Sequence, residues 1–337
     1  MDSLTHTVIG ACLGEAIAGK QLGKKAMLIG ALANNLPDID VITSLWASQT
    51  DELLIHRGIT HSILVATIFS PLLAFIFQKI YKKYPVSFKQ WLILFGSGMF
   101  LHIFIDAFTT YGTGWFEPFM NTRVSFNALF ILDPLLTLPV LIATIALLFL
   151  KTDSLKRRSW AKFGIGMFAF YLLFASINKI FVNGQVEKNL SIKEFPHSDF
   201  IATPTPLNNL LWYIIVRSDK DYYIGYYSIF DKNADISFEK INKNDTLLTN
   251  ASDPQQVKDL IRFSQNYYCL SVVNDTIVYS DMRFGQLGGW YKKNAPFVYN
   301  FNLARQGNNK IGLQKARFDS FSGEAITQLF KRMGGKQ

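Results

Sequence analysis

Long apolar runs alternate with short polar loops over the first half of the chain. Four runs approach the roughly 20 apolar residues that a helix needs to cross a bilayer. Two shorter apolar helices are predicted before them, at 3–18 and 26–36, and Pro37 breaks the second by removing a backbone donor. The apolar stretch 41–45 makes this second element a spanning or re-entrant segment. The pattern predicts an all-α multi-pass membrane bundle of about six helices. The four long runs lie at about 62–80, 91–109, 128–150 and 160–181.

The pattern changes after residue 181. Thr203-Pro204-Thr205-Pro206 is typical of an extended linker or the start of a strand. The β-rich runs 210–217 and 222–230 flank a polar turn and predict a hairpin. A short helix is predicted at 254–264, and residues 182–337 should therefore form a small soluble α+β domain after a membrane domain at 1–181. Further strands are predicted at 268–273, 276–280 and 296–303.

Composition and charge agree with a membrane protein. Hydrophobic residues make up 49 % of the chain and charged residues only 18 %, against about 25 % in a soluble protein. The net charge of +9 could indicate nucleic acid, but lysines and arginines gather in the loops at 79–89 and 151–162. By the positive-inside rule these loops are cytoplasmic, whereas 110–127 and 182–337 lie outside. Cys12 and Cys269 stand far apart, so no disulfide framework is expected.

The segment His56–Ser62 (HRGITHS) carries two imidazoles five residues apart, directly before an apolar run. A regular helix would point the two rings in different directions. Gly58 would let the backbone turn so that His56 and His61 face one point, as two metal ligands do. We interpret this segment as a turn that leads into a helix at about Thr60.

Other ionisable residues map to the same predicted side of the membrane. His102 and Asp106 stand four apart on one helical face inside an apolar span, which is a functional hypothesis by default. The alternative is a structural His–Asp pair that holds helices together. His6, Asp38 and Asp40 come from the first two helices. His6 alone would be a polar residue at a helix start, and the two aspartates alone a turn and N-cap.

Together these side chains suit a divalent metal, because imidazoles and carboxylates are the ligands of zinc and similar ions. They exceed the needs of one four-coordinate site, so one or two ions are expected, with zinc first and manganese as the alternative. The ion would activate a water that attacks an ester or phosphoester, with Asp40 or Asp106 as the general base. Arg57 either neutralises a phosphate or carboxylate or snorkels to the interface. Asp133, before Pro134, is either a helix cap or a further catalytic residue.

Four segments resemble the bacterial family of membrane-bound metal-dependent hydrolases, also described as LexA-binding, inner-membrane-associated hydrolases. They are Met1–His6 (MDSLTH), Leu36–Asp40 (LPDID), His56–Ser62 (HRGITHS) and His102–Asp106 (HIFID), of which the third is the most specific. The resemblance covers residues 1 to about 180 and implies a multi-pass inner-membrane protein, with hydrolase activity assumed for the family rather than well defined. It implies a metal-ligand role for His6, Asp38, Asp40, His56, His61, His102 and Asp106.

The segments around 203–212 and 280–285 resemble the tail of longer members. There, Asp281 and Arg283 either reach over the site or form a salt bridge at a strand end.

We therefore expect a metal-dependent hydrolase of the bacterial cytoplasmic membrane, with Asp40, Asp106 and Arg57 as catalytic residues. A site at membrane level suggests a lipid or lipid-linked substrate, with the bilayer and no nucleic acid as partner. Two other classes stay open. One is a regulator or transporter whose His/Asp cluster is structural or carries protons, and the other is a metal sensor without turnover. The sequence leaves the substrate and the oligomeric state open.

Overall fold

The structure is a computed structural model that describes residues 1–233, 235–250, 253–274, 276–303, 312–315 and 323–336. The chain forms two compact units. We call the first the helical unit; it comprises Met1–Leu45, Ile55–Ser176 and Pro206–Asn208. The other, the C-terminal unit, comprises Trp46–Leu54, Ile177–Thr205 and Asn209–Gln337.

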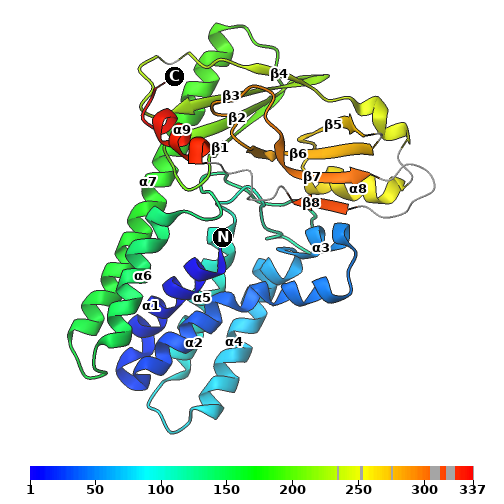
Figure 1. The fold of residues 1–337 in the computed structure, drawn as a ribbon. Helices are drawn as coiled ribbons and strands as arrows, with labels where there is room; N and C mark the ends of the chain where they lie inside the picture. The colour runs from blue at the N-terminus through cyan, green and yellow to red at the C-terminus, as the bar shows by residue number, and fades with distance from the viewer. Residues whose placement is uncertain (234, 251–252, 275, 304–311, 316–322, 337) are drawn as a thin grey trace. The chain divides into compact units, whose positions relative to one another are not determined.

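The helical unit is built on a close pair of helices, α1 (Ser3–Leu22) and α2 (Lys24–Asn35), which pack against α5 (Figure 1). Glycines let the backbones of α1 and α2 touch. A Cβ at Gly14 would lie 2.0 Å from the carbonyl oxygen of Ala26, and one at Gly30 would lie 2.2 Å from that of Gly10. Small residues at such a seam are typical of helix packing in membranes.

Three described helices are long and apolar enough to cross a membrane: α4 (Ile63–Ile80), α5 (Phe88–Asp106) and α7 (Lys156–Ile192). They correspond to three of the four predicted long spans. The fourth, predicted at 128–150, is α6 (Pro134–Phe149), which begins at the Asp133 cap and has only 16 residues. At 1.5 Å per residue it is shorter than the hydrocarbon core of about 30 Å. The part of the chain that the structure describes thus gives three candidate spans, and a bundle of about six stays unconfirmed.

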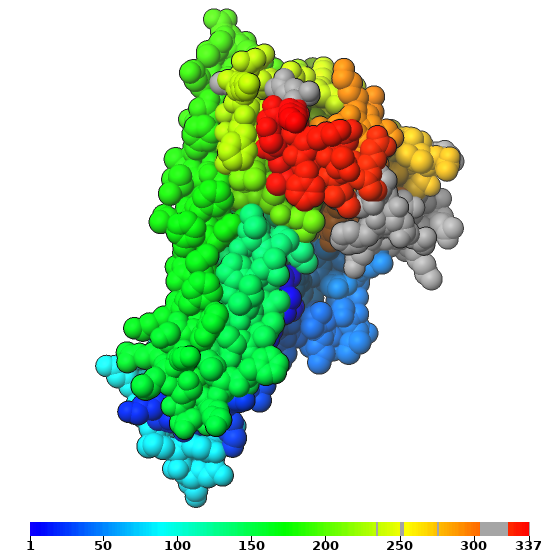
Figure 2. Space-filling view, turned by 60° about the vertical axis from the view of Figure 1, so that its left-hand side comes forward, coloured from blue at the N-terminus to red at the C-terminus, as the bar shows by residue number. Residues whose placement is uncertain are grey.

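Helix α7 continues well past the predicted end of the last span. Val182, Val186 and Leu190 stand four apart on one face of α7 and pack in a core with Trp212 and Ile214 of the sheet in the C-terminal unit. Polar residues lie between them, so composition alone indicated the start of a soluble domain here. Figure 2 shows α6 and α7 (green) covering much of α1 (dark blue) from one side of the helical unit.

Short helices connect α2 to α4. They are the 3₁₀ helix η1 (Leu36–Leu45), the helix α3 (Gln49–Ile55) and the 3₁₀ turn η2 (Ile59–His61). Ser62 then caps α4 by accepting a hydrogen bond from the Val65 N–H at 3.1 Å. The sequence predicted a helix start at about Thr60, and the observed α-helix begins three residues later, after η2.

The C-terminal unit contains two four-stranded antiparallel sheets, in the orders β1-β2-β3-β4 and β5-β6-β7-β8. The predicted hairpin is confirmed as β2 and β3, with Trp212 opposite Tyr227. The predicted strands correspond to β5, β6 and β7, and the predicted helix to α8 (Pro254–Phe263). The strands are Asp199–Pro204, Leu211–Arg217, Asp221–Ser228, Glu239–Asn242, Tyr268–Val273, Thr276–Gln286, Phe297–Leu303 and Gly312–Lys315, with η3 at Asp245–Asn250 and α9 at Gly323–Met333.

Candidate metal centre

Two aspartates enter the site from η1. Pro37 follows the last turn of α2, and the chain continues as a 3₁₀ helix that carries Asp38 and Asp40. Asp40 is buried and held by four donors. Its Oδ1 lies 2.9 Å from His56 Nδ1, and its Oδ2 accepts from the Arg57 N–H at 2.9 Å and from the Thr60 hydroxyl at 2.8 Å. The fourth is His61 Nδ1, 3.4 Å from Asp40 Oδ2.

The segment between His56 and His61 turns at an unexpected residue. Sequence reasoning assigned the turn to Gly58, but Gly58 has φ −86° and the positive φ, 58°, belongs to Arg57. A left-handed backbone is unfavourable for arginine. The contact of the Arg57 N–H with Asp40, together with burial of the Arg57 side chain, stabilises it. The turn sends His61 to the interior and leaves His56 partly exposed.

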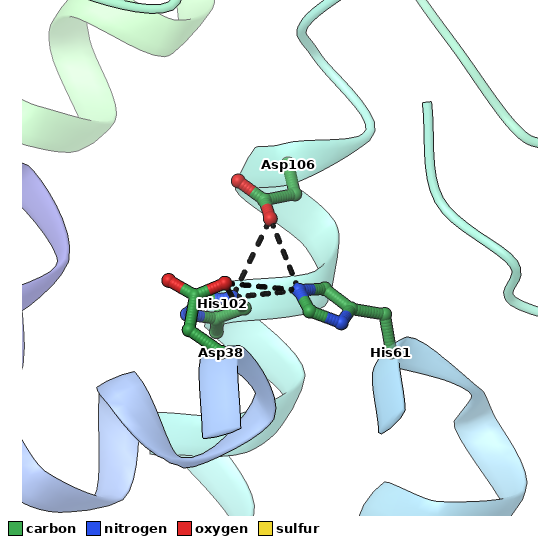
Figure 3. A group of neighbouring side chains, drawn as sticks. All are labelled: Asp38, His61, His102 and Asp106. Atoms are coloured by element: carbon green, nitrogen blue, oxygen red, sulfur yellow. Dashed lines mark hydrogen bonds and ion pairs between the residues drawn. The ribbon is translucent and has the colours of Figure 1, made fainter. Parts of the chain in front are cut away.

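Four side chains converge on one point (Figure 3): Asp38, His61, His102 and Asp106. The two Nε2 atoms of the histidines lie 3.0 Å apart. Asp38 Oδ1 lies 3.4 Å from each of them. Asp106 Oδ2 lies 3.3 Å from His61 Nε2 and 3.4 Å from His102 Nε2. In a tetrahedral zinc site with bonds of about 2.0–2.1 Å, neighbouring ligand atoms lie about 3.3 Å apart. These residues therefore fit a metal ion.

The groups behind the two histidines orient them for this role. His102 Nδ1 lies 2.5 Å from the carbonyl oxygen of Asn34. His61 Nδ1 lies 3.0 Å from the Thr60 hydroxyl and faces Asp40. Each ring therefore uses Nδ1 for the protein and turns Nε2 toward the shared point. Metal-binding histidines are held in this way by carbonyl and carboxylate oxygens.

Asp106 also favours a cation. Its Oδ2 is buried and accepts no hydrogen bond from any residue that the structure describes. That oxygen lies 3.1 Å from Arg57 Nε as an ion pair and points into the cluster. A buried carboxylate oxygen that has ion-pair contacts but accepts no hydrogen bond is poorly satisfied. A divalent ion at the shared point would satisfy it.

His6 lies beside this cluster rather than in it. Its ring stacks on that of His102 with centroids 3.8 Å apart, and its Nε2 lies 3.1 Å from Asp106 Oδ1, the oxygen that also contacts the backbone nitrogen of Met1. Asn34 donates to the His6 carbonyl oxygen at 2.7 Å. In this arrangement His6 supports Asp106 and is not one of the four converging ligands.

A second group, Asp38, Asp40 and His56, also brings its ligand atoms within 4.8 Å of one another. Asp38 belongs to both groups, so six of the seven predicted ligands lie in one connected patch, and the seventh, His6, contacts it through Asp106. The second group is less buried, because His56 stands at the edge.

Asp133 lies outside both groups. It caps α6 through the Leu135 N–H at 3.0 Å and accepts from the Tyr171 hydroxyl at 2.6 Å, which is the structural alternative.

The cluster attracts positive charge. Burial alone would raise the pKa of Asp40, but hydrogen bonds from His56 and His61 outweigh burial and hold that pKa well below its ordinary value. Burial disfavours protonation of His61, yet its contacts with Asp106, Asp38 and Asp40 raise the pKa of His61 to about 9. An ion at the shared point would take the place of this proton.

The side chain of Arg57 contacts the cluster and does not extend to the membrane–water interface. Its side chain is buried, with Nη1 donating to the Thr109 hydroxyl at 2.8 Å and Nε facing Asp106. The snorkelling interpretation is therefore wrong. Its guanidinium balances the charge of the Asp106 carboxylate, through the same oxygen that faces the two histidines.

Sequence reasoning missed the residues that hold the ligands in place. Asn34 and Thr60 carry no charge and no spacing signal, so only the fold reveals them. It also counted Arg157 among the cations of a loop, whereas Arg157 is buried in the first turn of α7 and pairs with Glu15 of α1. Its Nε and Nη2 donate to the two Glu15 oxygens at 2.8 and 2.5 Å. An acid in the first helix could have suggested such a partner.

The candidate spans and the cluster define a class: membrane proteins with a buried histidine and aspartate centre that could hold a metal ion. Residues 1–181 match the family described as YdjM inner membrane protein, and the chain belongs to this family. This membership and the apolar helices support a location in the cytoplasmic membrane.

Two curated relatives are similar to the chain. Uncharacterized protein YfhP of Bacillus subtilis (strain 168) is 26 % identical over 236 residues, which are 67 % of this chain and 68 % of that protein. Inner membrane protein YbcI of Escherichia coli (strain K12) is 28 % identical over 122 residues, which are 36 % of this chain and 69 % of that protein. No solved structure matches the chain.

Proposed function

We propose that the chain is a metal-dependent hydrolase of the cytoplasmic membrane that cleaves an ester or phosphoester bond. The observation that carries the proposal is the set of five nitrogen and oxygen separations of 3.0–3.4 Å among Asp38, His61, His102 and Asp106. In this proposal residues 1–181 form the membrane-embedded hydrolase domain and residues 182–337 an extracytoplasmic domain. The basic loops at 79–89 and 151–162, on the cytoplasmic side, support that topology.

A bound divalent ion, most readily zinc, would lower the pKa of a water and polarise the bond to be cleaved. The protein supplies the remaining parts. Asp38 is the one member of the four with a partly exposed side chain, at 22 %, so substrate approaches on its side. A second ion at Asp38, Asp40 and His56 is compatible with the same geometry.

His56 and Asp40 are the groups that we assign to proton transfer. Asp40 holds His56 Nδ1 at 2.9 Å, which leaves Nε2 of this partly exposed ring as the nitrogen that exchanges a proton with water or substrate. An imidazole oriented by a carboxylate is suited to this task. Asp106 is less suited to be the base, since Arg57, His6 and the cluster use both of its oxygens. The guanidinium of Arg57 neutralises the Asp106 carboxylate, so we do not assign it to neutralising the substrate.

The test is elemental analysis of the purified full chain, followed by a panel of esters and phosphoesters that includes lipids. We expect a stoichiometric divalent metal and turnover that a chelator abolishes and added zinc or manganese restores. Bound metal without turnover on the whole panel would identify a sensor. Turnover or partner binding that survives metal removal would reject a metal-dependent function. His197→Ala is the matched control, since His197 is exposed and lies outside the cluster.

A further inference from the structure

The residues that face outward around the centre are apolar. On η1, whose aspartates point inward, Ile39, Val41, Ile42 and Leu45 are 62 %, 64 %, 52 % and 79 % exposed. The segment 115–120, which forms a turn, and the 3₁₀ turn η2 expose further apolar side chains. We call the whole set the apolar rim: Ile39, Val41, Ile42, Leu45, Ile59, Phe116, Phe119 and Met120.

Both parts of the rim are joined to the residues of the centre. Asp38 and Asp40 lie between the exposed residues of η1, so the same 3₁₀ helix carries ligands on one side and rim on the other. Two of the backbone hydrogen bonds of the turn join it to segments beside the centre. Gly114 N–H donates to the Arg57 carbonyl oxygen at 2.8 Å, and Ile63 N–H donates to the Trp115 carbonyl oxygen at 3.0 Å.

The rim continues a surface that faces lipid. The candidate span α4 begins at Ile63, two residues after His61, and the candidate span α5 ends at Asp106. The centre therefore lies at the end of two spans, at the boundary of the bilayer. Ile63, Leu64 and Ile68 carry the apolar exposed surface on along the first turns of α4.

The polar side chains of η1 have their hydrogen bonds satisfied locally. The Thr43 hydroxyl donates to the Asp40 carbonyl oxygen at 2.7 Å, and the Ser44 hydroxyl donates to the Val41 carbonyl oxygen at 2.7 Å. Polar groups that leave water must find such partners within the protein. Such bonds also form in helices that face water, and here they let the segment lie in lipid without an unsatisfied hydroxyl donor.

We infer that the apolar rim is immersed in the lipid leaflet that the centre faces, and that Asp38 opens toward that leaflet. The substrate is then an amphiphile whose ester or phosphoester group lies at headgroup level and whose chains stay in the bilayer. It reaches the centre sideways from the lipid. The position of the rim is independent of catalysis, whereas the substrate class rests on the proposed function.

The position of the rim is tested by spin labelling of the full chain in nanodiscs of phosphatidylethanolamine and phosphatidylglycerol. The free cysteines Cys12 and Cys269 are replaced by alanine, and single labels are placed on Ile42→Cys or Leu45→Cys. Phe69→Cys on α4 is the lipid reference. Asp153→Cys, in the loop before α7, is the water reference.

We expect both rim labels to collide with oxygen more than with a water-soluble nickel chelate, as the lipid reference does. Labels that match the water reference would overturn the inference. So would labels shielded from both reagents, because that result means that protein covers the rim.

The substrate class is tested with the double variant Ile42→Ser/Leu45→Ser and the unsubstituted chain. We expect the variant to keep its metal and its turnover of a water-soluble ester, and to lose at least tenfold in turnover of an ester lipid in nanodiscs. Equal turnover of the lipid by both proteins would overturn access from the leaflet. If neither protein turned over either compound, the proposed function would fail, and the spin labels would still decide where the rim lies.

Discussion

Removing one histidine from the centre should have an effect that can be worked out in advance. His102→Ala deletes a nitrogen that lies 3.0–3.4 Å from three other ligand atoms. Structural zinc sites with four ligands bind with about 10–16 kcal/mol. An equal share per ligand is about 2.5–4 kcal/mol, and each 1.4 kcal/mol is about tenfold in affinity. We therefore expect zinc affinity to fall by about two to three orders of magnitude.

The comparison with Asp40→Asn separates ligands from the groups behind them. Asp40 orients His56 and His61 through contacts of 2.9 and 3.4 Å. Loss of such a partner typically costs about 10- to 100-fold in metal affinity. We expect Asp40→Asn to weaken binding less than His102→Ala while stoichiometry stays unchanged. A drop from two ions to one in Asp40→Asn would instead assign this residue to a second ion.

The assay is competition of the purified full chain with a fluorescent zinc chelator, with metal content from mass spectrometry of the same samples. Circular dichroism reports whether each variant keeps its helices, and His197→Ala should behave as the unsubstituted chain does. If His102→Ala were folded and bound zinc as tightly as the unsubstituted chain, the cluster would be a hydrogen-bonded network. The reasoning from its distances would then be refuted.

Three further predictions concern the frame around the centre. Gly14→Leu should leave no monodisperse protein on size exclusion in detergent, because α1 and α2 touch there, whereas Gly166→Leu should be tolerated because a Cβ at Gly166 meets nothing within 4 Å. Glu15→Gln should lower the unfolding free energy by about 3–5 kcal/mol in denaturant, because it leaves its guanidinium partner on α7 buried and unpaired. Asp281→Asn should likewise lower the melting temperature of the full chain, since the buried pair with Arg283, at 2.6 Å, is broken. An unchanged transition in either variant would contradict the argument for that pair.

Much of the helical frame follows from local patterns. Runs of apolar residues predicted all three candidate spans that the described residues show, because a span is defined by its own composition and length. The spacing of His102 and Asp106 put both on one face of α5, since a helix repeats every 3.6 residues. Two β-rich runs around a polar turn gave β2 and β3 for the same reason, as a hairpin is a local structure.

The features that the sequence hid depend on contacts between distant segments. The partner of His102 Nδ1 is the backbone carbonyl of Asn34. Any residue type would supply that carbonyl, so the sequence does not indicate this contact. Arg57 was expected either to neutralise a phosphate or carboxylate or to lie at the interface, and the fold buries it next to Asp106. Asp281 and Arg283 form the salt bridge that the sequence suggested, but it lies in the middle of β6 and not at a strand end, and its burial depends on the rest of the fold. Strand order and burial of this kind come from the whole fold.

The partial exposure of Asp38 has a consequence for how fast an ion would exchange. The other three ligands are closed off, so the path in and out passes the Asp38 carboxylate. Occupancy at equilibrium depends on all four side chains, but the rate of exchange depends mainly on this one. The centre would then bind its ion through all four ligands and exchange it through the opening beside Asp38.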